Sequence, residues 1–160
     1  MKEYNSVSEP FLADVRAVVG DANVFTEPEK LEQYKTDEEY DPRRFRVPEA
    51  VVRPANAEEI AAVVKLCNKY NVPLTVRSGG TSLADGAIAV CGGIVLLMER
   101  LNKIIEMNTE AMYVIAEAGV RTVDIQKMAN EAGYLYAGDP CSAESCLIGG
   151  NLATNAGGSK

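Results

Sequence analysis

Residues 73–82 read Pro73-Leu74-Thr75-Val76-Arg77-Ser78-Gly79-Gly80-Thr81-Ser82, an apolar strand pattern that runs directly into a turn of glycine and hydroxyl residues. Glycine takes up positive φ without strain and lets a ligand approach the backbone closely. Successive amides in such a turn form a concavity that attracts anions. The segment therefore predicts a phosphate-binding loop at the carboxyl end of a strand, where ligands of open α/β sheets bind. A plain tight turn is the alternative.

The residues before this loop predict a β-α-β unit. Residues 50–53 form a short apolar strand closed by Pro54, and Asn56 with Glu59 makes a capping-box pattern at the start of a helix. That helix has an apolar stripe at helical spacing and ends at Asn71. The crossover has the length expected between neighbouring parallel strands.

Further helices and strands are expected before and after this unit in the sequence. Before it we expect a helix over residues 8–19, a strand at 24–26, a short helix over 28–34 and a charged surface connection over 35–48. After it we expect a strand at 93–97, a hairpin of 104–107 with 113–116, and a helix capped by Thr122 that runs to about Glu131. The predicted fold is α+β, a small parallel β-α-β layer followed by an antiparallel β/α portion, in one unit over residues 1–160.

Composition excludes several classes of function. The net charge is −7 and the sequence contains no histidine. A nucleic-acid partner is not expected, because affinity for a polyanion comes largely from clustered Lys and Arg. Ser-His-Asp and Cys-His mechanisms need a histidine, and no Cys/His zinc site or other metal site is predicted. We assign no catalytic residue within the chain.

The four cysteines and the hydropathy give the remaining expectations. No CxxC pair occurs, and we interpret Cys67 and Cys91 as small core residues. No apolar run approaches the roughly 18 residues of a membrane span, and the N-terminus lacks the apolar core of a secretory signal. We therefore expect no transmembrane segment and a cytoplasmic location.

A second glycine-rich segment lies at residues 148–158, which read Ile148-Gly149-Gly150-Asn151-Leu152-Ala153-Thr154-Asn155-Ala156-Gly157-Gly158. Each glycine inside a helix or strand costs about 0.5–1 kcal/mol relative to alanine, so we expect an irregular loop anchored by its apolar residues. A flexible tail is the alternative. Neither GxGxxG after a strand nor GxxxxGK[ST] occurs, which excludes the two commoner phosphate loops.

The two segments together carry a resemblance to a known family. Val51-Val52-Arg53-Pro54, the capped helix, residues 73–82 and residues 148–158 occur in an order that resembles the FAD-binding domain of the vanillyl-alcohol oxidase family. The nearest branch contains glycolate oxidase and D-lactate dehydrogenase. The match runs from about Tyr34 to the end of the sequence.

The resemblance implies non-covalent FAD and a set of residues that bind it. The first loop wraps the pyrophosphate with Arg77 at its base, a second loop lies near the flavin ring and ribityl chain, and the last packs on the cofactor. The implied cofactor-binding residues are Arg77, Ser78, Gly79, Gly80, Thr81, Ser82, Pro140, Ser142, Gly149, Gly150, Thr154, Asn155, Gly157 and Gly158.

The sequence also departs from the family pattern. The family usually has glycine where Ser82 stands, and a small residue followed by glycine where Ala84-Asp85 stand. We expect Asp85 to point away from the pyrophosphate. The histidine that tethers FAD in some members is absent, and the spacing of Cys141 to Gly149 does not match a thioether link. The sequence ends just after the second segment, so we expect a fragment whose remaining FAD domain and substrate domain lie outside it.

The resemblance implies a flavin-dependent oxidoreductase that oxidises a 2-hydroxy acid such as glycolate or D-lactate by hydride transfer to the flavin. The reduced flavin would pass its electrons to an unidentified acceptor. The fragment alone is expected to be inactive and to bind FAD weakly. A stand-alone nucleotide- or phosphate-binding module without redox chemistry is the alternative.

Overall fold

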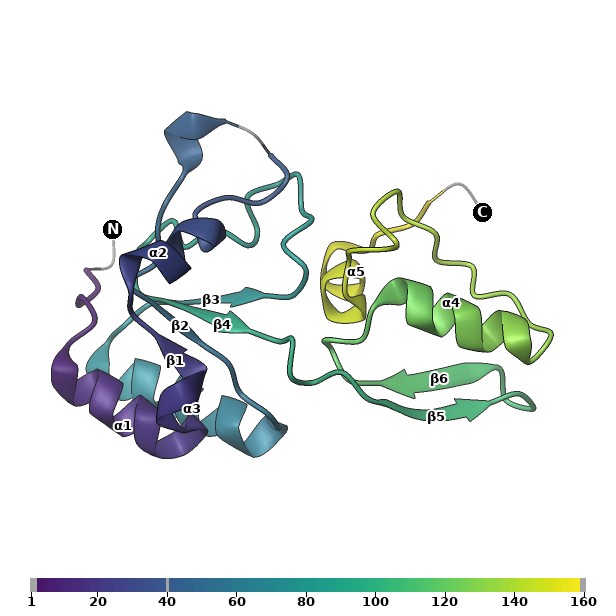
Figure 1. Ribbon diagram of the computed structural model, residues 1–160, viewed down its shortest axis with the longest axis horizontal. Coiled ribbons are helices and arrows are strands. Elements are labelled where there is room, and N and C mark those ends of the chain that lie inside the picture. The colour runs from purple at the N-terminus through teal and green to yellow at the C-terminus, as the bar shows by residue number, and fades with distance from the viewer. Residues whose placement is uncertain (1–2, 40, 159–160) are drawn as a thin grey trace.

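The computed structural model describes residues 3–39 and 41–158 as two lobes that lie side by side (Figure 1). The first lobe, residues 3–98, opens with helix α1 (Glu9–Val19). The Ser8 hydroxyl accepts a hydrogen bond from the Phe11 amide at its start, and Gly20 at φ 84° ends it, so the helix expected over residues 8–19 is confirmed. The short η1 (Asp21–Asn23) then leads into the first strand.

The sheet of the first lobe has the order β1-β2-β4-β3. Strand β1 (Val24–Phe25) is antiparallel to β2 (Ala50–Val52), and both β2 and β3 (Leu74–Arg77) are parallel to β4 (Ile94–Leu97). The prediction that β2 and β3 are neighbours is wrong. Strand β4 is buried at all four positions, and such a continuously apolar strand belongs at the centre of a parallel layer.

Helices cover both faces of this sheet (Figure 1). Ile94 and Leu96 pack toward α1 and α3 (Ala57–Tyr70), while Val95 and Leu97 pack toward Leu31 of α2 (Pro28–Leu31). This alternation is the period of two that a strand imposes on its side chains. Helix α3 has the predicted cap, since the Asn56 Oδ1 accepts from the Glu59 amide at 2.8 Å.

The connection from β1 to β2 passes over the carboxyl ends of the strands. It consists of α2, η2 (Glu32–Tyr34) and η3 (Pro42–Arg44), and within it the Arg46 amide donates to the Lys35 carbonyl at 2.9 Å. Asp41 Oδ1 accepts from the Arg43 amide at the start of η3. The two ends of this charged connection are therefore joined by a backbone hydrogen bond.

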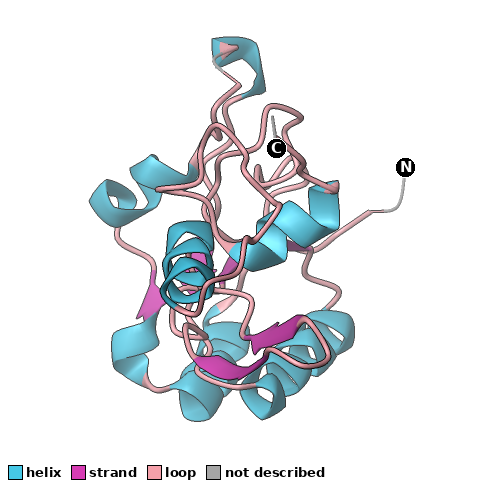
Figure 2. Ribbon diagram, turned by 90° about the vertical axis from the view of Figure 1, so that its right-hand side faces the viewer, coloured by secondary structure: helices cyan, strands magenta, loops and turns pink. Residues whose placement is uncertain are grey.

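The second lobe, residues 103–158, is built on a two-stranded antiparallel hairpin of β5 (Ile104–Asn108) and β6 (Tyr113–Ala116). Helix α4 (Thr122–Glu131) lies over the hairpin in both views (Figures 1 and 2), and Ile125 packs with Val120 and Ile148. Arg121 is the N-cap of α4, so the prediction that Thr122 caps it is wrong. Thr122 is instead the first residue of the helix, and it is fully buried.

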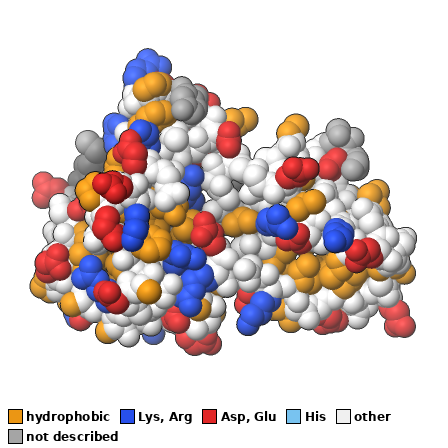
Figure 3. Space-filling view, in the orientation of Figure 1, with side chains coloured by type: hydrophobic (Ala, Val, Ile, Leu, Met, Phe, Trp, Pro, Cys, Tyr) orange, Lys and Arg blue, Asp and Glu red, His pale blue; other side chains and the backbone are white. Residues whose placement is uncertain are grey.

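The surface differs between the lobes. Charged side chains of both signs are spread over the first lobe, whereas hydrophobic side chains form a band over the hairpin of the second (Figure 3). Ile105 and Ile115 of this hairpin are exposed. Cys67 is buried as predicted, but Cys91 is exposed because it lies in the turn that the Gly92–Ala89 hydrogen bond closes, outside the sheet. Among residues 3–39 and 41–158, no helix is both long and apolar enough to span a bilayer.

Candidate cofactor site

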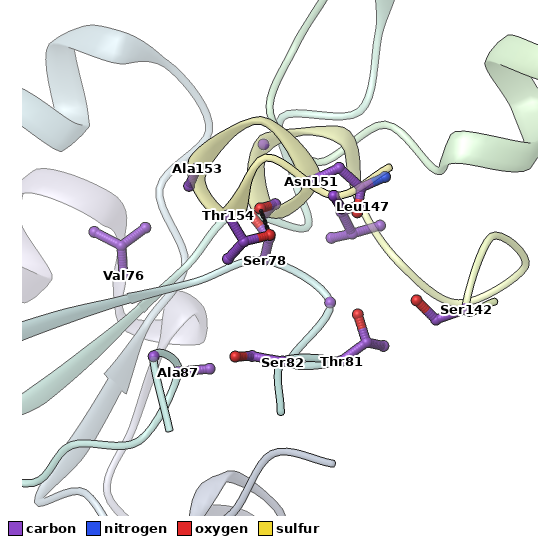
Figure 4. Close-up of a pocket in the computed structure, with 16 residues that line it drawn as sticks. Val76, Ser78, Thr81, Ser82, Ala87, Ser142, Leu147, Asn151, Ala153 and Thr154 are labelled. Atoms are coloured by element: carbon purple, nitrogen blue, oxygen red, sulfur yellow. Dashed lines mark hydrogen bonds between the residues drawn. The ribbon is translucent and has the colours of Figure 1, made fainter. Parts of the chain in front are cut away.

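A cleft of about 210 Å³ separates the end of β3 from helix α5 (Ile148–Thr154) (Figure 4). Residues 78–82, Gly86 and Ala87 line it from the first lobe. Ser142, Leu147 and the side of α5 that bears Gly149 and Gly150 line it from the second. The two glycine-rich segments therefore share one cavity.

The first glycine-rich segment is an irregular loop whose amides are unused. Within residues 3–39 and 41–158, the N–H groups of Gly79, Gly80, Thr81 and Ser82 donate no hydrogen bond. In the same part of the chain the hydroxyls of Ser78 and Thr81 also have no partner. Thr81 and Ser82 lie across the cleft from α5 (Figure 4). Unpaired amides turned in one direction form a site for an anion.

Arg77 lies beneath this loop and supports it. Its guanidinium donates to the carbonyls of Thr36 at 2.8 Å and Ala87 at 3.4 Å, and it faces the Tyr34 ring with its central carbon 5.7 Å from the ring centroid. Burial lowers the pKa of Arg77 below its ordinary value. Gly80 passes directly over the side chain at φ 71°, where an added Cβ would lie 2.7 Å from the Arg77 Nε. Arg77 therefore holds the loop from behind and does not line the cleft.

The second glycine-rich segment is helical, which corrects the prediction of an irregular loop. Helix α5 includes both Gly149 and Gly150. A Cβ on Gly149 would lie 2.7 Å from the Ala118 Cβ, and one on Gly150 would lie 3.4 Å from the Ser78 Cβ. These glycines let the helix approach two neighbours closely. Such packing offsets the 0.5–1 kcal/mol that a helical glycine costs.

The first amides of α5 are already paired. The Gly149 amide donates to the Ala118 carbonyl at 2.9 Å, and the Ile148 amide donates to the Val120 carbonyl at 2.8 Å. The Gly150 amide donates to the Leu147 carbonyl at 3.0 Å. Helix α5 thus supplies shape to the cleft, whereas the first loop supplies the free donors.

A buried polar cluster that sequence reasoning missed holds α5 in place. Asn151 Nδ2 donates to the Thr122 Oγ1 at 2.6 Å, and that oxygen lies 3.1 Å from the Cys146 Sγ. Thr122 and Cys146 are almost fully buried. The one sequence signal for this cluster is Thr122, a polar residue at the start of the apolar stripe of its helix.

The lobes also meet directly behind the cleft. A Cβ on Gly79 would lie 2.9 Å from the Ser145 carbonyl oxygen and 3.1 Å from the Cys146 Cα. Backbone therefore lies against backbone at this point of contact between the two lobes.

Other residues that the resemblance implies lie elsewhere. Ser142 and Thr154 line the cleft, but Pro140, Asn155, Gly157 and Gly158 do not. The Asp139 amide donates to the Gly157 carbonyl at 3.0 Å, and this pairing joins the chain around Pro140 to the segment that follows α5. These four residues form the outer part of the second lobe beside α5.

The donors of the cleft fit the diphosphate of FAD. No charged side chain among the described residues lines the cavity, so nothing in it repels an anion. Hydrogen bonds to charged groups contribute about 1.5–3 kcal/mol each, and four amides with two hydroxyls are available. Pockets for drug-sized ligands usually measure roughly 300–1,000 Å³, so this smaller cleft suits a part of the cofactor.

The fold and the cleft define a cofactor-binding α+β domain in which a glycine loop at a strand end faces a closely packed helix. The sequence profile of the family described as FAD binding domain matches residues 48–160. The chain therefore belongs to the FAD binding domain family, whose cofactor is FAD.

Curated relatives agree with this assignment. Glycolate oxidase subunit GlcD of Bacillus subtilis is 35% identical over 117 residues, which cover 73% of this chain and 25% of that protein. D-lactate dehydrogenase of Anaerostipes hadrus is 40% identical over 69% of this chain and 23% of its own length. D-2-hydroxyglutarate dehydrogenase of Xanthomonas citri is 36% identical over 95% of this chain and 32% of its own length. The chain thus spans about a quarter to a third of these relatives.

Solved structures share the fold. An alkyldihydroxyacetonephosphate synthase superposes with a TM-score of 0.83 at 21% identity, covering 98% of this chain and 33% of that chain. A p-cresol methylhydroxylase superposes with a TM-score of 0.71 at 26% identity, covering 91% of this chain and 30% of that chain. The resemblance to vanillyl-alcohol oxidase-type FAD-binding domains is confirmed, as are the α+β class and the glycolate oxidase and D-lactate dehydrogenase branch.

Proposed function

We propose that residues 1–160 form the diphosphate-binding part of the FAD-binding domain of an oxidoreductase that oxidises a 2-hydroxy acid. One observation supports this most directly: Gly79 to Ser82, whose amides have no hydrogen-bond partner among the described residues, line a cleft without charged side chains opposite α5. FAD, when bound, supplies the redox chemistry by accepting hydride from the substrate carbon. The residues of this chain bind and orient it.

Each part of the cleft has a proposed role. The amides of the first loop donate to the diphosphate, and the hydroxyls of Ser78 and Thr81 add two further donors. Gly150 lets α5 lie close to Ser78, since even a Cβ at this position would come within 3.4 Å of the Ser78 Cβ. Ser142 and Thr154 face the same cleft from the second lobe. The remaining residues that the resemblance implies, among them Pro140 and Gly158, are proposed to contact the parts of FAD outside this cleft.

The names of the relatives support the proposed substrate class. The names of the three relatives described above refer to glycolate, D-lactate and D-2-hydroxyglutarate, all 2-hydroxy acids. No titratable side chain among the described residues lines the cleft, so the base that removes the hydroxyl proton is proposed to lie outside residues 1–160. The electron acceptor is unidentified, and the cytoplasmic location remains a prediction.

Non-covalent attachment of FAD is also part of the proposal. The sequence has no histidine, and Cys141 is exposed and does not line the cleft. Denaturation of the flavin-loaded protein should therefore release all of the flavin. Flavin that stays with the precipitated chain would contradict this.

The decisive experiment compares FAD with ADP. We expect the apoprotein to quench FAD fluorescence on titration, and we expect Thr81→Val to weaken that binding. In the flavin-loaded whole protein, anaerobic addition of glycolate, D-lactate or D-2-hydroxyglutarate should bleach the flavin. Binding of ADP that is as tight as that of FAD, with no bleaching by any hydroxy acid, would favour a nucleotide-binding module without redox chemistry.

The 160-residue chain alone provides a second test. Its cleft encloses only a part of FAD, so we expect weak binding and no turnover. Submicromolar FAD binding by this chain would contradict that expectation.

A further inference from the structure

Asp85 occupies an unusual backbone position next to the cleft. Its φ is 58°, in the left-handed region that favours glycine, and Asp is one of the few other residues that tolerate it. Glycine would meet the backbone requirement without adding a carboxylate, so the aspartate calls for an explanation of its own.

The carboxylate lies close to the expected site of an anion. Asp85 directly precedes Gly86 and Ala87, both of which line the cleft. Its side chain is only 16% exposed, and its Oδ1 is buried without a hydrogen-bond partner among the described residues. An unpaired carboxylate at this point would repel a dianionic diphosphate, and the low dielectric of a partly buried site strengthens such repulsion.

Arg44 neutralises this carboxylate from another part of the chain. Its guanidinium pairs with Asp85 Oδ2, and its Nε lies 3.7 Å from Asp41 Oδ2. The ion pair with Asp85 raises the pKa of Arg44, and Asp41 and Glu39 add to the effect. The neighbouring Arg43 pairs with Asp41 alone, and its side chain is 89% exposed. Of the two arginines, only Arg44 therefore reaches the loop beside the cleft.

The connection that contains Arg44 also forms hydrogen bonds to the residues around the cleft at two further points. The Glu38 amide donates to the Ser82 carbonyl at 3.0 Å, and the Thr36 carbonyl accepts from Arg77 at 2.8 Å. Residues 36–38 thus hold the start of the cleft wall formed by residues 78–87, through Arg77, and its middle, at Ser82. The Arg44–Asp85 pair adds a contact near the far end of that wall, where no backbone hydrogen bond to residues 36–39 or 41–44 is present among the described residues.

We infer that Arg44 is a positioning residue of the FAD site. It acts through Asp85, because the ion pair holds residues 82–87 in place and neutralises the negative charge of the carboxylate beside the diphosphate. This inference rests on the proposed function.

The first experiment compares FAD affinity among matched variants. Arg44→Ala should weaken FAD binding by about fivefold at low salt, the upper range for a largely exposed ion pair, because it leaves the Asp85 carboxylate uncompensated. Arg43→Ala removes the same charge one residue away and should change the affinity by less than about twofold. Raising the salt concentration should shrink the difference between the two variants, since exposed charges are screened.

Rescue provides the sharper test. The double variant R44A/D85N lacks both charges and should recover FAD affinity to within about twofold of the unsubstituted protein, as should R44A/D85G. If the double variants bind FAD no better than Arg44→Ala, charge compensation is refuted. Equal weakening by Arg43→Ala and Arg44→Ala would refute it as well.

Amide hydrogen exchange on the apoprotein tests the positioning role without flavin. Arg44→Ala should raise exchange in residues 82–88 and leave α3 unchanged, whereas Arg43→Ala should change neither. Unchanged exchange in residues 82–88 would overturn the positioning role. If the unsubstituted whole protein did not bind FAD, the proposed function would fail, and this measurement would still decide whether Arg44 holds the loop.

Discussion

The two glycine-rich segments of this protein look alike in sequence and do different work. Residues 78–82 form an irregular loop, in which the amides of Gly79 to Ser82 have no partner among the described residues, whereas residues 148–154 form a helix whose first amides are paired with Ala118 and Val120. In the first segment Gly80 needs its positive φ. In the second, Gly149 is needed because a side chain would overlap Ala118. A glycine can thus mark an exposed donor or a close packing contact, and only its surroundings distinguish the two.

The largest effect should come from Gly80→Ala. Alanine at φ 71° costs about 1–2 kcal/mol, and its Cβ would displace the Arg77 guanidinium from its hydrogen bonds to Thr36 and Ala87. We expect the free energy of unfolding to fall by about 2–4 kcal/mol in denaturant titrations.

Gly133→Ala is the matched control for this substitution. Gly133 has φ 82° and no atom within 4 Å of an added Cβ, so this substitution measures only the free-energy cost of alanine at a positive φ. It should lower the free energy of unfolding by only about 1–2 kcal/mol. Equal losses at both sites would show that the contact of Gly80 with Arg77 contributes nothing.

The second prediction concerns the hydroxyls of the first loop. Ser78→Ala and Thr81→Val remove donors without a protein partner among the described residues, so each should weaken FAD binding by about 1.5–3 kcal/mol and leave the unfolding midpoint unchanged. Thr154→Val is the control, since that hydroxyl already donates to the Gly150 carbonyl at 2.9 Å. Isothermal titration with FAD would contradict the division of roles if Thr154→Val weakened binding as much as Thr81→Val.

The third prediction separates two adjacent glycines of α5. Gly149→Ala places a Cβ 2.7 Å from the Ala118 Cβ and should lower the free energy of unfolding by about 1–2 kcal/mol, after the gain in helix propensity. Gly150→Ala meets Ser78 at 3.4 Å and should leave stability unchanged or slightly raised, while it weakens FAD binding by narrowing the cleft. Thermal melts and FAD titrations of both variants test this difference. Equal changes in stability and in FAD affinity for the two variants would contradict it.

The smallest effect is a difference in thiol reactivity. Burial raises the pKa of Cys67 to about 11, so its thiolate is scarce at pH 8 and it should resist thiol reagents in the native protein. Cys91 and Cys141 are exposed and should react first. Mass spectrometry after brief labelling would show modified Cys67 early if the described packing of α3 were wrong.

Much of the fold could be predicted from local pattern. Ser8 and Gly20 delimit α1, Asn56 and Glu59 begin α3, and Asn71 at φ 54° ends it. These are short-range signals, because each cap depends on residues three or four positions apart. The loop after β3 could be predicted for the same reason, since its glycine and hydroxyl residues are contiguous.

What could not be predicted depends on partners far along the chain. The place of β4 between β2 and β3 follows from which strand is buried on both faces, and the helical form of α5 follows from its packing on Ala118 and Ser78. The Thr122–Cys146–Asn151 cluster joins residues 24 or more positions apart. Glycine composition and local spacing carry no information about such contacts.

The central place of β4 has a consequence for how the protein is made. Strands β2 and β3 emerge from the ribosome earlier but have no hydrogen bonds to each other, since both pair only with Ile94–Leu97 among the parallel strands. The layer must therefore wait for its last strand, and until then residues 78–82 follow a strand that has no partner. Long-range pairing of this kind is slow because the intervening chain must close first. Residues 78–82 are consequently attached to a paired strand only in the folding step that completes the sheet.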